Sequence, residues 1–322
     1  MLKEIGAQAA AGVRRYDDHD AFAAALLGGD VEYLPMPGQP FEATLRVLRV
    51  GDVVVQHAAD SAHVTRAALQ PGLSALVVPL SSDGRMPVSN GSAIGARNAI
   101  LVPGGMEFIV TCPDPQVWGS LAVPSAMAEE LADLESRRRP AAMPGVLNMT
   151  PEIFGEVSAA FAAAGRLAQE APEVLAMPGC AEGLAASLKE LVATALAPGL
   201  GREPRGRALR EATRVVRAAD ECLRHNLGRP IYRDELCAAI GVSRRKLHDA
   251  FVAVVGMTPP SYLKLRRLVL ARRALRAGHG GERLVKSVAL THGFWHLGYF
   301  AKDYRALFGE LPSQTVSYAD RA

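Results

Sequence analysis

A short basic run that begins at Ser243 contains the side chains best suited to chemistry in this sequence. Leu247 and Phe251 lie four residues apart, which places them on one inward face of a helix. The outward residues are Arg244, Arg245, Lys246, His248 and Asp249. Guanidinium, imidazole and carboxylate groups can bond to base edges, and cationic groups also bind phosphates. The pattern indicates a helix that contacts nucleic acid.

The same pattern occurs again about 52 residues later. Cys237-x-x-x-Gly241 corresponds to Ala289-x-x-x-Gly293, and Phe251-x4-Gly256-x2-Pro259 corresponds to Tyr304-x4-Gly309-x2-Pro312. Five positions in one order at nearly one offset indicate a duplicated supersecondary unit. In the second copy Phe300 and Tyr304 face inward. Its outward residues are His296, Leu297, Gly298, Ala301, Lys302 and Arg305.

Each copy predicts a helix, a tight turn and a second helix. In the first copy a helix over Arg233–Ile240 ends at Gly241, which tolerates a left-handed backbone, and Ser243 caps the next helix. A small residue four positions before the glycine lets two helices cross closely. These are the features of a helix-turn-helix, whose second helix enters the major groove. We expect recognition helices at about 243–254 and 295–308. The alternative is a pair of packed hairpins in a helical repeat protein.

Charge is distributed unevenly along the 322 residues. Residues 1–200 carry 13 Lys and Arg against 22 Asp and Glu, a balance of −9, whereas residues 201–322 carry 23 against 11, a balance of +12. Such asymmetry favours a polyanion as the partner of the basic half. A helix over about 260–277 would space the two copies roughly 34 Å apart, one turn of DNA. Its cations could also touch phosphates: Lys264, Arg266, Arg267, Arg272, Arg273 and Arg276.

Residues 210–318 closely resemble the DNA-binding domain of AraC/XylS-type transcription regulators. The second unit carries the most specific motifs, Ala289-x3-Gly293-Phe294, His296-Leu297-Gly298-Tyr299-Phe300 and Tyr304-x3-Phe308-Gly309-x2-Pro312-Ser313. The residues of these motifs resemble those of the subgroup that contains XylS and the ethanolamine-operon activators. The resemblance implies a regulator of promoter DNA, an activator that contacts RNA polymerase, with repression as the alternative. It covers about a third of the chain.

The resemblance also implies which residues meet DNA. Base-edge contacts are expected from Arg245, His248 and Asp249 in the first unit and from Leu297, Gly298, Ala301 and Lys302 in the second. Asp249 departs from the family, where a basic or amide residue is commoner; it could accept from cytosine N4 or orient Arg245. Three of the second set cannot bond through a side chain, so that unit is expected to read by apolar contact, shape and phosphates. The phosphate candidates are Ser243, Arg244, Lys246, Arg273, His296, Tyr299 and Arg305.

The first 200 residues predict an α+β organisation. Short apolar runs separated by turn residues predict strands within about 20–122, after a short helix over Asp20–Leu27. Helices are expected at 123–139, 151–170 and 172–196, and the stripe Leu184, Leu188, Leu191 is either core or a dimer surface. By layout alone this region resembles the family's cupin-like sensing and dimerisation module, a barrel or sandwich with trailing helices. We therefore divide the chain into a domain at 1–196, a Gly/Pro/Arg-rich linker at 197–207, and an all-α domain at 208–322.

A cupin-type enzyme is the least favoured reading. Such enzymes need clustered His and carboxylate ligands on adjacent strands, and the candidates His57 and His63 lie six residues apart without an H-x-H pair. The sequence contains no G-x-S-x-G, P-loop or H-E-x-x-H motif. No metal or other cofactor is therefore expected. Four scattered cysteines, no long apolar run and no signal-like start lead us to expect a cytoplasmic protein.

A small effector could bind within the first domain, in an apolar pocket with a few polar anchors. The residues considered as its lining are Tyr33, Met36, Phe41, Arg46, Arg49, His57, Met106, Phe108 and Trp118. Arg46, His57, Phe108 and Trp118 are the ligand-binding candidates, and Arg46 hints at a carboxylate-bearing effector. The alternative is an effector-independent regulator whose first domain serves only dimerisation or protein partners. A homodimer through helices 151–196 is expected in either case.

Overall fold

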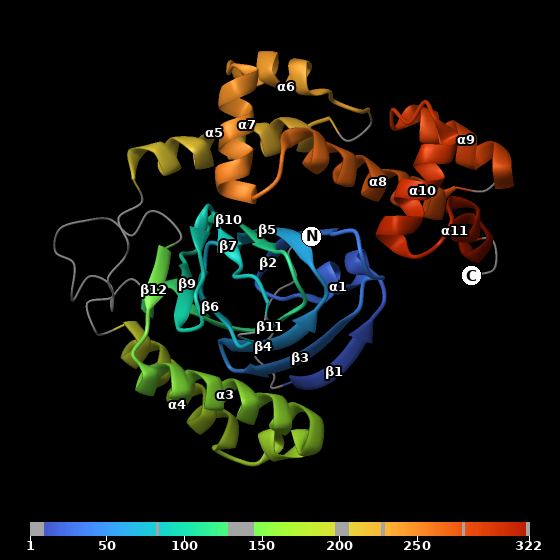
Figure 1. The fold of residues 1–322 in the computed structure, drawn as a ribbon. Helices are drawn as coiled ribbons and strands as arrows, with labels where there is room; N and C mark the ends of the chain where they lie inside the picture. Colours follow the sequence, from blue (N-terminus) through green and yellow to red (C-terminus); the bar gives the residue numbers. More distant parts are fainter. Residues whose placement is uncertain are drawn as a thin grey trace. The chain divides into compact units, whose positions relative to one another are not determined.

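The computed structural model describes residues 10–81, 84–127, 145–196, 206–226, 229–278 and 281–319. Contacts divide the chain into two compact units (Figure 1). The first contains the described residues up to Tyr33 and from Glu42 to Leu196. The second contains Leu34–Phe41 and the described residues from Gly206 onward. Residues 197–205 of the predicted linker lie outside the described residues, and a helix already begins at Arg207.

Two antiparallel sheets form the first unit. One has the order β1-β3-β4-β11-β6-β9-β12 and the other β2-β5-β10-β7-β8. The strands are β1 (Ala10–Tyr16), β2 (Gly29–Pro35), β3 (Ala43–Val50), β4 (Val53–Asp60), β5 (His63–Leu69), β6 (Leu73–Pro79), β7 (Val88–Ser89), β8 (Ser92–Ala93), β9 (Asn98–Val102), β10 (Glu107–Cys112), β11 (Gln116–Pro124) and β12 (Gly145–Asn148). Buried apolar side chains from both sheets meet in a shared interior, as the cupin-like prediction requires.

The strand core extends beyond the predicted range of about 20–122. β1 pairs with β3, and β12 pairs with β9, so the larger sheet has a strand at each edge that the apolar runs did not indicate. β1 has the sequence AAGVRRY, in which charged residues replace the expected alternation. An edge strand with one exposed side needs few apolar residues, which explains why it was missed.

Residues on β11 alternate between two environments. Trp118, Ser120 and Ala122 face the interior between the sheets, where they line a cavity. Gly119 faces the other way, and Phe161 of α3 lies directly over it. A Cβ atom at position 119 would stand 2.6 Å from the Phe161 ring, so this contact requires glycine.

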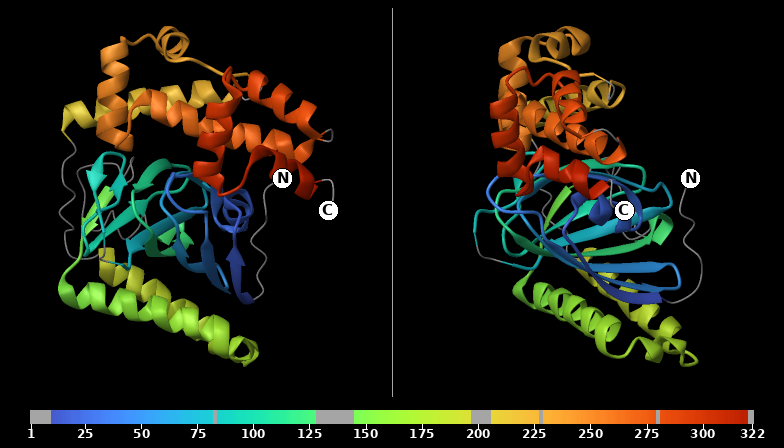
Figure 2. Two further views of the ribbon diagram at one scale, coloured as in Figure 1. Left: turned by 45° about the vertical axis from the view of Figure 1, so that its right-hand side comes forward. Right: turned by 90° about the vertical axis from the view of Figure 1, so that its right-hand side faces the viewer.

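The helices of the first unit are α1 (His19–Ala25), α3 (Pro151–Glu170), the 3₁₀ helix η1 (Pro172–Ala176) and α4 (Cys180–Leu196). Thr150 caps α3 by accepting a hydrogen bond from the Ile153 N–H, and Pro151 takes the first helical position. α3 and α4 lie side by side along the larger sheet (Figure 2). Leu188 is buried, and Leu184 and Leu191 pack against the same cluster. The apolar stripe of α4 therefore belongs to the intramolecular core.

The helix predicted over 123–139 is described only in part. Val123 and Pro124 continue β11, and residues 125–127 are helical. The remainder of the predicted helix lies outside the described residues.

From Gly206 onward, the described residues of the second unit form helices joined by turns. Its helices are α5 (Arg207–Arg224), α6 (Arg233–Ile240), α7 (Arg244–Val255), α8 (Pro259–Ala277), α9 (Gly281–Thr291), α10 (Leu297–Phe308) and α11 (Pro312–Ala319). α6 and α7 form one helix-turn-helix and α9 and α10 the other, with α8 between them (Figure 1). None of the helices in the described part of the chain is long and apolar enough to span a membrane.

The two turns have the backbone geometry that the sequence predicts. Gly241 has φ +67° and Gly293 has φ +77°, both in the left-handed region. The hydroxyl of Ser243 accepts from the N–H of Lys246 at 3.2 Å, which fixes the start of α7. α10 begins at Leu297, two residues later than predicted, because its N-cap residue His296 has an extended backbone, with φ −107° and ψ 97°. Trp295 and His296 therefore belong to the turn.

Candidate nucleic-acid interface and cavity

α7 presents its polar side chains to solvent and its apolar ones to the core. Leu247, Phe251 and Val254 are fully buried. The side chain of Arg245 is 91% exposed and that of Asp249 is 65% exposed, and His248 is exposed as well. Arg245, His248 and Asp249 therefore share one exposed face of α7, and the opposite face of this helix packs in the core.

Arg245 and Asp249 form a loose ion pair on that face. The Arg245 Nε atom lies 3.7 Å from Asp249 Oδ2, one helical turn away. Exposed pairs of this kind contribute only about 0.3–0.5 kcal/mol, so the pair directs the guanidinium without locking it. This contact supports the orienting role of Asp249. For the alternative role, in which Asp249 accepts a hydrogen bond from cytosine N4, the ion pair with Arg245 would only have to separate.

The flanking cations of α7 are held by acids of neighbouring helices. Arg244 Nη2 lies 2.5 Å from Asp234 Oδ2 of α6, and Lys246 Nζ lies 2.7 Å from Glu211 Oε1 of α5. The Lys246 hydrogen bond lowers the pKa of Glu211 from its ordinary value. Because exposed pairs are weak, a DNA phosphate could replace either carboxylate as the partner. Ser243 is the helix cap, which leaves its hydroxyl engaged with the backbone.

The corresponding face of α10 is apolar and small rather than charged. Leu297 is 40% exposed, Gly298 and Lys302 are exposed, and Ala301 is half-buried. Arg305 and His296 are also exposed. Two large aromatic residues stand beside this set, Trp295 at 70% and Tyr299 at 71% exposure. Trp295 was not assigned to DNA binding from the sequence; its position directly after Gly293-Phe294, with no inward partner at i+4, was the available signal.

The prediction that all the cations of α8 are available to phosphates is wrong for at least two of them. Arg266 is 3% exposed and its Nη1 lies 3.3 Å from Asp220 of α5, which also accepts from the Tyr262 hydroxyl. Arg272 is 8% exposed. Arg267 is half-buried, donates to the Gly293 carbonyl oxygen at 3.3 Å, and stacks on aromatic rings. These arginines hold the helical unit together, and periodicity alone could not separate them from Arg273 and Arg276.

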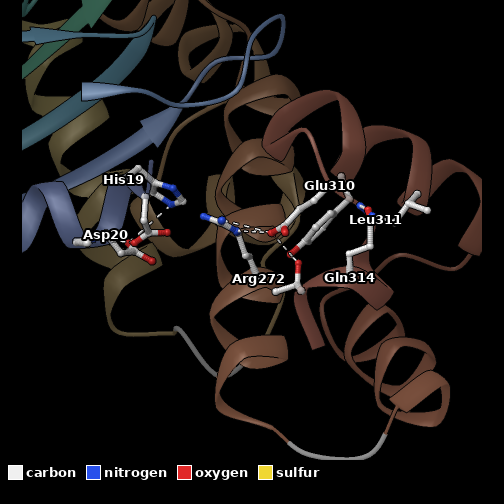
Figure 3. Close-up of polar contacts among 10 residues, drawn as sticks. His19, Asp20, Arg272, Glu310, Leu311 and Gln314 are labelled. Atoms are coloured by element: carbon white, nitrogen blue, oxygen red, sulfur yellow. Dashed lines mark hydrogen bonds and ion pairs between the residues drawn. The ribbon is translucent and has the colours of Figure 1, made fainter. Parts of the chain in front are cut away.

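Arg272 stands at the centre of a polar network that positions α10. Its Nε and Nη2 atoms donate to Glu310 Oε1 (Figure 3). Its guanidinium lies 4.8 Å from the centre of the Phe308 ring. Thr315 donates to the same oxygen at 2.8 Å and lies 2.7 Å from the Tyr304 hydroxyl. The Leu311 N–H is bound by Gln314 (Figure 3). Glu310 thus explains the acidic position of the Phe308–Ser313 motif.

A cavity of about 120 Å³ lies between the two sheets of the first unit. Of the predicted lining residues, Tyr33, Phe108 and Trp118 border it. Two of these residues, Tyr33 and Trp118, donate hydrogen bonds from the phenol hydroxyl and the indole N–H to Asp60, both at 2.9 Å. Burial raises the pKa of the Asp60 carboxyl above its ordinary value. Gln56 is also at the cavity wall, bonded to Ser120 and to both backbone groups of Leu27.

Arg46 and His57 do not border this cavity, contrary to the prediction. Arg46 of β3 pairs with His57 of β4, and both side chains face the helices. Side chains alternate along a strand, and the neighbouring Gln56 takes the inward position. Arg46 Nη1 lies 3.3 Å from His57 Nδ1, and Arg46 Nε lies 3.5 Å from Gln169 of α3. Burial, with the Arg46 charge second, lowers the pKa of His57.

The two histidines considered as metal ligands lie in different sheets. His57 is on β4 of the larger sheet, whereas His63 is on β5 of the smaller one, where its Nδ1 lies 2.8 Å from the Ser61 carbonyl oxygen. Within the described ranges no three His, Cys, Asp or Glu side chains form a group that could hold a metal.

Comparison with known proteins bears directly on the helical unit. A family model described as "Helix-turn-helix domain" matches residues 236–317. The XylDLEGF operon transcriptional activator of Pseudomonas putida is 33% identical over 152 residues, which cover 47% of this chain and 46% of the activator. A probable AraC family transcriptional regulator from Rhodopseudomonas palustris CGA009, known from a crystal structure, is 38% identical; the match covers 33% of this chain and 97% of that one, with a TM-score of 0.30.

The chain belongs to the AraC/XylS family. Its second unit is the AraC-type helix-turn-helix domain, and its first unit has the antiparallel double sheet expected of the family's cupin-like module. A probable thc operon regulatory protein of Rhodococcus erythropolis is also 33% identical, over 102 residues that cover 32% of this chain and 31% of that protein. These relatives are transcription regulators and not enzymes. The matched segments span less than half the length of the Pseudomonas putida and Rhodococcus erythropolis relatives.

Proposed function

We propose that this AraC/XylS-type chain is a sequence-specific DNA-binding regulator that activates transcription. The observation that carries the proposal is the duplicated helix-turn-helix, in which α7 and α10 each have exposed residues opposite a buried apolar face. The similarity to the XylDLEGF operon transcriptional activator favours activation over repression. The excess of cations in residues 201–322 supports DNA as the partner.

The two recognition helices read two adjacent segments of the major groove by different means. In α7, Arg245 pairs with guanine O6 and N7, while His248 and Asp249 contact neighbouring base edges. In α10, Leu297, Gly298, Ala301 and Lys302 face the bases, so contact with thymine methyl groups replaces most hydrogen bonding. Phosphates are bound by a wider set: Ser243, Arg244, Lys246, Arg273, His296, Tyr299 and Arg305. The loss of one such contact should lower the salt dependence by about 0.9 in the log–log slope.

The first unit provides the regulatory and dimerisation functions. A small effector occupies the cavity beside Phe108 and Trp118, and the dimer forms through α3 and α4. Because the apolar stripe of α4 is buried against the sheet, the dimer contact uses the exposed faces of these helices. RNA polymerase is the partner in activation, and the protein acts in the cytoplasm. A regulator without an effector, whose first unit only dimerises or binds protein partners, is the second candidate.

Selection of bound fragments from random-sequence duplex DNA tests the proposal. The full-length protein is used at about physiological salt, because nonspecific binding depends strongly on salt. We expect an enriched site with two segments roughly 34 Å apart, and a duplicate of that site if the dimer binds. Arg245→Ala should relax one base pair of the site, whereas Arg85→Ala, an exposed arginine of the first unit, should leave it unchanged. Salt-sensitive binding with no enriched sequence would contradict specific recognition.

A further inference from the structure

The cavity of the first unit is bordered mainly by hydrocarbon. Val77, Ile94, Ile100, Phe108, Val110 and Ala122 are among its lining residues, contributed by both sheets. Its volume of about 120 Å³ is close to the roughly 150 Å³ of an engineered apolar cavity that binds benzene. The space is therefore suited to a molecule of about one six-membered ring.

Several polar groups at its wall already have hydrogen-bond partners within the protein. Both polar atoms of the Gln56 amide are bonded to the backbone of Leu27, and its nitrogen also reaches Ser120. Tyr33 and Trp118 direct their donors at Asp60, which is 4% exposed and also lies 3.6 Å from His63. Burial raises the pKa of the Tyr33 phenol and of the Cys112 thiol, so neither becomes an anion at neutral pH.

The lining includes no lysine or arginine among the described residues. Arg46 faces α3, and Arg66, which lies between the lining residues Thr65 and Ala67 on β5, forms an ion pair with Glu107. A carboxylate in the cavity would lose hydration without a lysine or arginine at the wall to balance its charge, and the Tyr33 and Trp118 donors at that wall already serve the Asp60 carboxylate. Burial of an uncompensated charge is strongly unfavourable.

We propose that this cavity binds an uncharged, predominantly apolar molecule of about one ring and excludes carboxylates. The inference rests on the proposed effector role and reverses the chemistry that Arg46 suggested from the sequence. The Asp60 cluster acts as a closed polar end that repels anions, while the hydrocarbon wall supplies the affinity.

Nitrobenzene and benzoate test the proposal, because they have nearly the same shape and differ in charge. Binding of each to the full-length protein without DNA is measured by calorimetry, and the site is located by NMR contacts to the Val77 and Val110 methyl groups. We expect nitrobenzene to bind at least tenfold more tightly than benzoate. Benzoate binding of equal or greater strength would overturn the proposal, as would the absence of nitrobenzene binding.

Four variants assign the effect to the cavity. Ala122→Leu fills the space and should abolish nitrobenzene binding, with Val77→Leu as a milder filling if the first variant does not fold. Arg46 lies outside the cavity, so Arg46→Ala should leave the binding of nitrobenzene and benzoate unchanged. Asp60→Asn keeps acceptors for Tyr33 and Trp118 while it removes the charge, so benzoate binding should strengthen. If Arg46→Ala weakened binding instead, the ligand would be at the Arg46–His57 surface. DNA selection is measured separately, so failure of DNA recognition and failure of ligand recognition remain distinguishable.

Discussion

Arg272 binds a single oxygen of Glu310 through both Nε and Nη2, at 3.3 Å each. This contact joins the middle of α8 to the turn that follows α10. Because Thr315 and Tyr304 continue the same network, the orientation of the second recognition helix depends on a residue 25 positions before that helix begins.

Arg272→Met should destabilise the helical unit and disturb α10 more than α7. The substitution leaves Glu310 without its cation in a largely buried position, and we expect a loss of about 2 kcal/mol in the free energy of unfolding. Urea denaturation of the full chain measures this loss, and Arg245→Met, at a side chain that is 91% exposed, is the control. An equal effect of both variants would remove the special role of the Glu310 contact.

Arg245→Ala should cost about 1–3 kcal/mol on the selected site and broaden the preference at one base pair. Asp249→Asn separates the two roles of that carboxylate. If Asp249 orients Arg245, the asparagine variant broadens the same base pair; if it reads cytosine, a neighbouring pair changes instead. Affinities for the selected site and for all its single-base variants supply the measurement. Equal weakening on specific and random DNA would contradict a base contact by Arg245.

Thymine-to-uracil replacement should weaken binding within the α10 segment of the site. Uracil lacks only the C5-methyl group, and a buried methyl contributes roughly 0.8 kcal/mol, about a fourfold change in affinity. Replacement of thymines within the α7 segment is the internal control, since reading there depends on hydrogen bonds. Trp295→Ala should reduce the uracil effect if this exposed ring lies against a methyl group. No difference between thymine and uracil anywhere in the site would exclude apolar reading.

His57 should make stability depend on pH near neutrality. Burial and the Arg46 charge lower its pKa in the folded chain, so the unfolded chain binds a proton first as the pH falls below about 6.5. The contribution of His57 is complete above that value and is lost as the pH falls toward the lowered pKa. Urea denaturation at pH 7.5, 6.5 and 5.5 should show a shallower loss for His57→Gln than for the natural chain.

Gly119→Ala should destabilise the first unit by about 1–3 kcal/mol, because the new methyl group overlaps the Phe161 ring. Phe161→Leu in the same chain should recover part of that loss by freeing space. Gly155→Ala is a matched control, since a Cβ atom there meets nothing within 4 Å. Thermal unfolding compares the variants. An unchanged midpoint for Gly119→Ala would show that α3 can shift away from β11.

Local signals in the sequence were sufficient for the helical unit. Gly241, Ser243 and Gly293 determine their turns through backbone preference and capping, which are properties of a few adjacent residues. The same logic failed for Arg266 and Arg272, whose partners Asp220 and Glu310 are distant in sequence. It failed again for Arg46 and His57, because the inward side of β3 and β4 is decided by strand pairing. The edge strands β1 and β12 were missed because an edge strand needs few apolar residues.

The contact between Gly119 and Phe161 has a mechanical consequence. On one side of β11, Trp118 and Ser120 border the cavity. On the other side, the Phe161 ring of α3 packs directly against the backbone of Gly119. No flexible side chain at position 119 absorbs a displacement between the two. A molecule that pushed the cavity wall outward would therefore displace β11 and, through the contact between Gly119 and Phe161, α3 as well.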